Sequence, residues 1–104
     1  MFSFVETKLF TRLVKDFLKD EEYTHLQKVL MKHPDAGAVI RDSGGLRKLR
    51  WAVQGRGKRG GLRVIYQFRH ADGIFWMITM YPKNTRDSIS GHVLRQIREE
   101  IEND

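Results

Sequence analysis

Several basic residues lie in or directly after stretches that are expected to form β-strands, which would hold their side chains in fixed directions. Lys48 and Arg50 alternate with apolar residues across residues 46–53, Arg63 lies near the start of a second alternating stretch, and Lys83 follows a third apolar run. Several cations on one face of a sheet repel one another unless an anion or an acidic partner is present. The other interpretation, salt bridges to carboxylates of nearby helices, suits a single member better than the whole set. We therefore expect these four residues to bind an anionic partner, such as the phosphates of a nucleic acid.

A glycine-rich, basic segment lies between the first two of these stretches. Residues 54–61 carry Arg56, Lys58 and Arg59 among four glycines. Glycines let the backbone approach a ligand, and the cations supply charge for phosphate binding. The segment joins two expected strands and lacks the Gly-x-x-x-x-Gly-Lys-Ser/Thr pattern, so it is not a P-loop. A solvated hairpin loop whose charges only aid solubility explains the segment equally well.

Three further residues complete the candidate RNA-binding set. Tyr81 and Asn84 lie at the end of the third stretch, where a rigid strand can position a nucleotide, and Arg47 adds charge beside Lys48. Trp51 and Trp76 have the chemistry for base stacking, but both lie in apolar runs, which favours core packing.

No metal or cofactor site is expected. The chain has no cysteine, and its four histidines are not spaced as metal ligands. No group of serine or cysteine with histidine and aspartate indicates nucleophilic catalysis.

Bulk properties agree with an anionic partner. The 104 residues carry a net charge of +6, and between residues 41 and 69 only Asp42 offsets the lysines and arginines. The length fits one domain, residues 1–104. The lack of cysteines, of a signal-peptide pattern and of a membrane-length apolar run leads us to expect a cytoplasmic location.

Periodicity predicts an α+β fold. Apolar pairs recur at four-residue spacing over residues 9–18, Asp20 is a suitable N-cap for a second helix that Pro34 ends, and Asp72-Gly73 predicts a hairpin. The run 74–81 is apolar on both faces, which favours a central position in the sheet. The expected order is an N-terminal strand, two helices, a three-stranded antiparallel meander that completes a four-stranded sheet, and a C-terminal helix capped by Ser90.

Three motifs together resemble the HigB-type branch of the RelE/ParE toxin superfamily. They are Gly-Gly-Leu-Arg-Lys-Leu-Arg at 44–50, Gly-Arg-Gly-Lys-Arg-Gly-Gly-Leu-Arg-Val-Ile-Tyr at 55–66 and Tyr-Pro-Lys-Asn at 81–84. The resemblance implies a RelE-like fold and a ribosome-dependent endoribonuclease that cleaves mRNA and is neutralised by a cognate antitoxin.

The resemblance also implies roles for single residues. Lys48 and Arg50 match the paired basic residues of the second strand, Arg63 the arginine that opens the third, and Lys83 a basic residue after the fourth. RelE proper has a further arginine and a tyrosine where this chain has Asn84 and Ser90. That departure leaves the general acid unassigned.

Two alternatives stay open at this point. A ParE-like gyrase inhibitor would share the fold but needs no cationic site on the sheet. A non-catalytic RNA-binding or ribosome-binding module would bind with strong salt dependence and leave mRNA whole.

Overall fold

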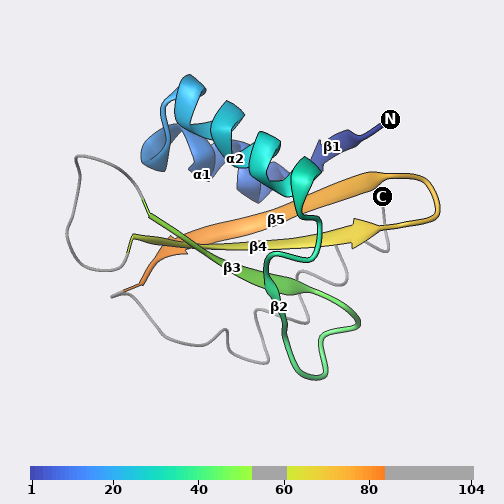
Figure 1. Cartoon of the computed structure of the whole chain (residues 1–104). Helices are drawn as coiled ribbons and strands as arrows, with labels where there is room; N and C mark the ends of the chain where they lie inside the picture. The colour runs from blue at the N-terminus through green and yellow to red at the C-terminus, as the bar shows by residue number, and fades with distance from the viewer. Residues whose placement is uncertain (53–60, 84–104) are drawn as a thin grey trace.

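A computed structural model describes residues 1–52 and 61–83 of the chain (Figure 1). Within them lie two helices and one five-stranded sheet, with strand order β1-β5-β4-β3-β2. The elements in chain order are β1 (Ser3–Glu6), α1 (Lys8–Phe17), α2 (Asp20–Lys32), β2 (Ala38–Val39), β3 (Arg47–Trp51), β4 (Leu62–Arg69) and β5 (Ile74–Pro82).

The expected α+β class is confirmed, with one strand more than the sequence predicted. β3, β4 and β5 form the antiparallel meander, and β1 pairs in parallel with β5 at one edge. The extra strand, β2, pairs with Arg47 and Lys48 at the other edge. It has only two residues, both exposed, and is therefore too short to show an alternating pattern. The C-terminal helix expected from the sequence lies outside the described residues.

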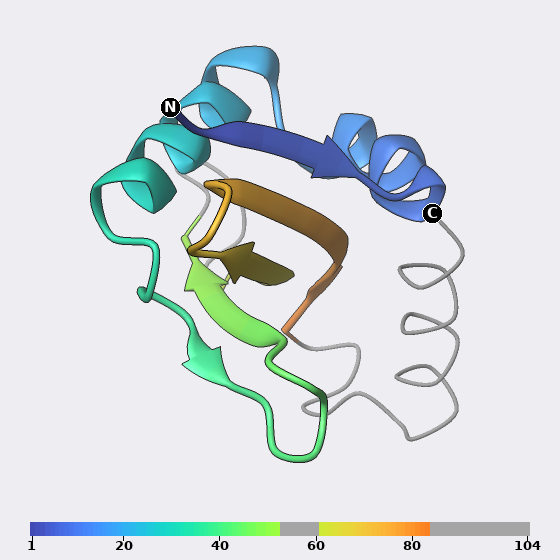
Figure 2. The ribbon, with the colours of Figure 1, turned by 90° about the vertical axis from the view of Figure 1, so that its right-hand side faces the viewer.

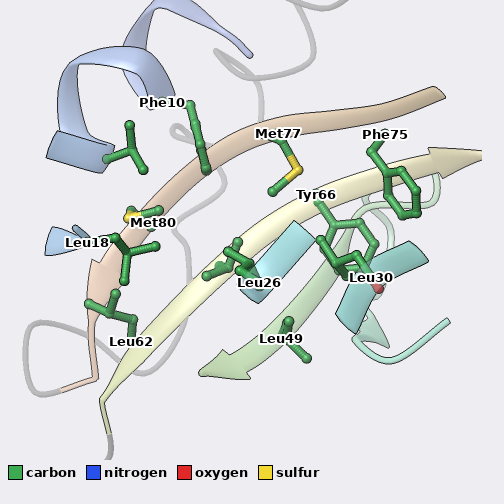
Figure 3. Packing of buried hydrophobic residues seen from close by; sticks show 12 residues of the cluster. Phe10, Leu18, Leu26, Leu30, Leu49, Leu62, Tyr66, Phe75, Met77 and Met80 are labelled. Carbon is green, nitrogen blue, oxygen red and sulfur yellow. The ribbon is translucent and has the colours of Figure 1, made fainter. Parts of the chain in front are cut away.

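Both helices cover one face of the sheet (Figures 1 and 2). Phe10 and Val14 of α1 and Leu26 and Leu30 of α2 are buried, as the four-residue spacing predicted. They pack on side chains that β3, β4 and β5 direct toward the helices, and Figure 3 shows Leu26 and Leu30 close to Tyr66. The strand contribution to this core is Leu49, Leu62, Val64, Tyr66, Phe75, Met77 and Met80.

The start of α2 differs from the expectation by one residue. Lys19, not Asp20, is the N-cap, and the helix begins at Asp20. The reason is the carboxylate of Glu22, which accepts a hydrogen bond from the backbone N–H of Lys19 at 2.7 Å. The contact at the helix start thus comes from Glu22 of the first turn and not from the side chain of Asp20.

A hairpin turn and a pair of side-chain hydrogen bonds fix the backbone around the sheet. The Asp72-Gly73 hairpin is confirmed: Gly73 has a φ of 68°, and its N–H donates to the carbonyl of Arg69 at 2.9 Å. The second contact holds the segment that follows α2: the buried hydroxyl of Tyr66 donates to the Pro34 carbonyl at 2.7 Å and accepts from Gly37 N–H at 2.9 Å. Burial raises the pKa of Tyr66, so this hydroxyl stays protonated and holds the segment that leads to β2.

A β-bulge interrupts the pairing of β4 with β5. Ile65 pairs with Thr79 but the next residue, Tyr66, pairs with Met77, so Ile78 is the extra residue. Thr7, which is almost fully buried, secures this irregular point: its hydroxyl donates to the Ile78 carbonyl at 2.6 Å. The same oxygen accepts from Phe10 N–H at 3.0 Å and so caps α1.

We expect Thr7→Val to lower the free energy of unfolding by about 2–3 kcal/mol, because it removes a helix cap and leaves a buried carbonyl without its donor. Urea denaturation measures this loss. Thr11→Val is the matched control: Thr11 is exposed, its hydroxyl donates to the carboxylate of the half-buried Glu6, and its replacement should change stability by less than about 0.5 kcal/mol. Equal losses in the two variants would show that Thr7 does not secure the bulge.

Candidate active site

Strand register places three of the predicted site residues in one row. Arg50 of β3 lies opposite Arg63 of β4, and Arg63 lies opposite Tyr81 of β5. Residues that face each other across neighbouring strands project from the same face of a sheet. The row therefore crosses three strands on the face that the two helices leave uncovered.

Two lysines adjoin this row. Lys48 precedes Arg50 by two residues on β3, so it projects from the same face, and its register partner is Ile65. Lys83 comes just after β5, two residues beyond Tyr81, with an exposed side chain. Its backbone N–H donates to the carbonyl of Gly61 at 3.1 Å, which fixes this turn beside the start of β4. The structure thus brings Lys48, Arg50, Arg63 and Lys83 to one end of one sheet face. These four residues and Tyr81 form what we call the cationic row.

The bulge decides on which face Tyr81 projects. In uninterrupted alternation Tyr81 would share a face with Phe75 and Met77, which pack under the helices. The extra residue at Ile78 reverses the alternation, so that Met80 enters the helix-covered core and Tyr81 joins Arg63. This reversal could not be predicted from the sequence, because residues 74–81 are apolar on both faces and have no polar period to break.

Arg63 and Arg50 have different surroundings within the row. Arg63 is buried, with only 8% of its surface exposed, and its Nη1 lies 3.4 Å from the carbonyl of Leu62. Arg50 is exposed at the end of β3. A buried guanidinium held by its neighbours can present fixed N–H donors, whereas an exposed one can follow a ligand.

The face with the cationic row is not purely polar. Farther along it lies a second apolar cluster of buried side chains, Leu46, Ile65 and Ile78, against which Trp76 and Tyr81 pack. The sequence predicted only one apolar face for β4 and missed this cluster, although Ile65 between two inward residues was the signal for it. Trp76 packs as expected, with the Arg69 guanidinium 5.4 Å from its ring centre. Because Tyr81 packs against this cluster, the row borders apolar side chains on one side.

Arg47 lies apart from the cationic row. Its register partner is Tyr66, which projects toward the helices. Its Nη1 donates to the Gly37 carbonyl at 2.7 Å, and its Nη2 lies 3.4 Å from Asp35 Oδ1. Arg47 is thus engaged in holding the segment before β2.

Four other predicted RNA-binding residues lie outside the described part of the chain. They are Arg56, Lys58, Arg59 and Asn84. Among residues 1–52 and 61–83 no group of histidines and carboxylates is arranged to hold a metal ion. Neither of the two helices there is both long and apolar enough to cross a membrane.

Comparison with known proteins gives the family. A family model described as the RelE toxin of the RelE/RelB toxin–antitoxin system matches residues 4–102. The chain belongs to the RelE toxin family. The predicted superfamily is therefore confirmed, while its HigB-type branch stays a prediction.

A solved structure carries the same fold. The Escherichia coli toxin RelE, determined as a doubly substituted mutant in the free state, matches with a TM-score of 0.61 over 96% of this chain and 97% of that one. The two sequences are 13% identical, so the likeness shows the RelE fold and not shared site residues. Membership of the family implies a toxin that acts with a cognate antitoxin.

The neighbours Arg47 and Lys48 give a test of the two faces. We expect Arg47→Met to lower the free energy of unfolding by about 1 kcal/mol, since it removes a charged hydrogen bond, and to leave RNA affinity within about twofold. Lys48→Met should weaken binding to single-stranded RNA and reduce the slope of log K against log salt by about 1, with stability little changed. Fluorescence-anisotropy titrations at several salt concentrations measure both. Equal loss of RNA affinity in the two variants would place Arg47 in the binding surface after all.

Proposed function

We propose that this RelE-family toxin is a ribosome-dependent mRNA endoribonuclease of the HigB type, and that it inhibits translation in the cytoplasm. The observation that carries the proposal is the register Arg50–Arg63–Tyr81, with Lys48 and Lys83 on either side of it. Cations from two strands and one turn thus gather on the face that the two helices do not cover.

In the proposed reaction the two arginines of the cationic row bind the phosphate. A scissile phosphodiester gains charge on its non-bridging oxygens as a phosphorane forms, and N–H donors fixed in advance stabilise that charge most effectively. Arg63 is buried and already positioned, so it suits the oxygen that becomes most negative. Arg50 is exposed and suits the initial capture of the RNA chain.

The lysines account for proton transfer. RNA carries its own nucleophile, so the enzyme need only hold the 2′-OH in line with the phosphorus. One lysine, Lys48 or Lys83, takes the 2′-OH proton as O2′ forms a bond to phosphorus. The bond from phosphorus to O5′ breaks, and O5′ receives a proton from the other lysine in its ammonium form. The products are a 2′,3′-cyclic phosphate and a 5′-OH, and these steps call for no metal or cofactor.

The proposed partners follow from the resemblance to HigB-type toxins. The RNA substrate is mRNA in the decoding site, so ribosomal RNA lies next to the bound toxin. The cognate antitoxin is expected to be acidic or amphipathic and to cover the cationic row, because a cover of opposite charge would block phosphate entry.

Replacing one residue of each kind tests the catalytic assignment. We expect the double variant Arg63→Gln, Lys83→Met to cut mRNA at least about 100-fold more slowly, because it removes one charge-stabilising donor and one proton-transfer group. Primer extension on mRNA in a translating extract measures the rate. Lys32→Met, in the last turn of α2 and away from the row, removes one charge as the control. An undiminished rate in a folded double variant would rule out the assignment.

The two alternatives predict different outcomes in the same preparation. A gyrase inhibitor would block DNA supercoiling and leave translation unchanged. A binding module would slow translation with every mRNA still whole. Either result would contradict the proposed nuclease.

A further inference from the structure

A hollow of about 560 Å³ opens beside the cationic row, between the start of α2 and the end of β3. Figure 1 shows these two ends at the same end of the sheet. β2 pairs only with Arg47 and Lys48, so it does not cover the last residues of β3. The hollow has the size of a site for a small organic ligand. The described residues that line it are Glu21, Glu22, His25, Arg50, Trp51 and Ala52.

Two aromatic rings form part of its wall. The rings of His25 and Trp51 are 5.3 Å apart between centroids and tilted by 50°. His25 is exposed, and Trp51 is half-buried with its inner part on the helix-covered core. An indole that packs against the core with one part and is accessible to solvent with another can stack on a flat, aromatic ligand.

The hollow is lined by side chains of both negative and positive charge. Glu21 and Glu22 lie in the first turn of α2, and Glu22 Oε1 accepts from Lys19 N–H. Carboxylates accept hydrogen bonds, whereas the Arg50 guanidinium only donates them. A ligand that suits this wall is flat and has N–H donors on one edge and acceptors on another.

Arg50 belongs both to the hollow and to the cationic row. An RNA chain whose phosphate lies on the row therefore has a neighbouring nucleotide within reach of the hollow. This step rests on the proposed function, because it takes the ligand to be part of the same RNA.

We infer that the hollow binds a guanine base of the substrate RNA. The base stacks on the Trp51 indole beside the tilted ring of His25, its N1–H and N2–H groups donate to a carboxylate of α2, and its O6 and N7 accept from Arg50. Uracil presents carbonyl oxygens on both sides of its single N–H, so the carboxylate repels it. Cytosine and adenine have an amino group but lack the paired N–H donors of guanine. The site selects the base, while the cationic row holds the phosphate.

Mononucleotides test the site without ribosome or cleavage. We expect 5′-GMP to shift the NMR signals of the Trp51 indole N–H and the His25 ring, and to bind about tenfold more tightly than 5′-UMP, the value of one good base contact. Because both nucleotides carry the same phosphate, their difference reports the base alone. The variant Trp51→Phe assigns the indole signal against that of Trp76.

Matched variants on α2 identify the carboxylate. Glu21→Gln should reduce the preference for GMP over UMP to less than about threefold. Asp20→Asn removes the same charge one residue earlier, does not line the hollow, and should leave the preference intact. Equal affinity for the two nucleotides, or equal effects of the two substitutions, would overturn the inference.

The outcome is separable from that of the proposed function. Binding of GMP at Trp51 in a protein that leaves mRNA whole would keep the base site and refute the nuclease. Cleavage of mRNA by a protein that binds GMP and UMP alike would keep the nuclease and refute the base site.

Discussion

The single extra residue in β5 is the constraint on which the candidate site depends. Ile78 shifts the register of β5 against β4 by one, and a shift of one exchanges the two faces of a strand. Before the bulge Met77 packs under the helices, and after it Met80 does so, which leaves Tyr81 with Arg63 on the face that α1 and α2 do not cover. Without the bulge, the end of β5 would direct Tyr81 into the helix-covered core, and the row across three strands would not form.

The rest of the fold supports this irregular point and the strands beside it. The Thr7 hydroxyl satisfies the bulge carbonyl and starts α1, so the edge strand, the helix and the bulge are tied at one atom. On the other side, Tyr66 holds the segment at Pro34 and Gly37, where a Cβ on Gly37 would lie only 2.9 Å from the Tyr66 ring. Arg47 reinforces this segment through Gly37 and Asp35. Polar groups near the core thus fix the backbone of the strands that carry the cationic row.

Local patterns in the sequence predicted the elements well and their exceptions poorly. The four-residue spacing of α1, the alternation of β4 and the Asp72-Gly73 turn depend on short-range physics, and each prediction was confirmed. β2 was missed because two exposed residues become a strand only through their pairing with β3. The bulge was missed because residues 74–81 have no polar period to break, and because Thr7, whose hydroxyl bonds the Ile78 carbonyl, lies 71 residues away in the sequence.

The candidate site shows the same division. Strand period alone placed Lys48, Arg50 and Arg63 on a common side, and the register confirms that geometry while their chemical roles stay predictions. Arg47 looked equivalent to Lys48 in the sequence. Successive side chains of a strand point to opposite faces, however, so Arg47 points away from the cationic row and contacts Asp35 and Gly37. The hollow between α2 and β3 joins residues about 30 positions apart, Glu21 and Trp51, which no local motif connects.

The most direct test of the central claim is to map the ends of mRNA in a translating extract with and without the purified protein. The cationic row predicts new ends inside reading frames, with a 2′,3′-cyclic phosphate on one fragment and a 5′-OH on the other, and only while ribosomes occupy the message. Intact mRNA in an extract whose translation the folded protein blocks would contradict the account.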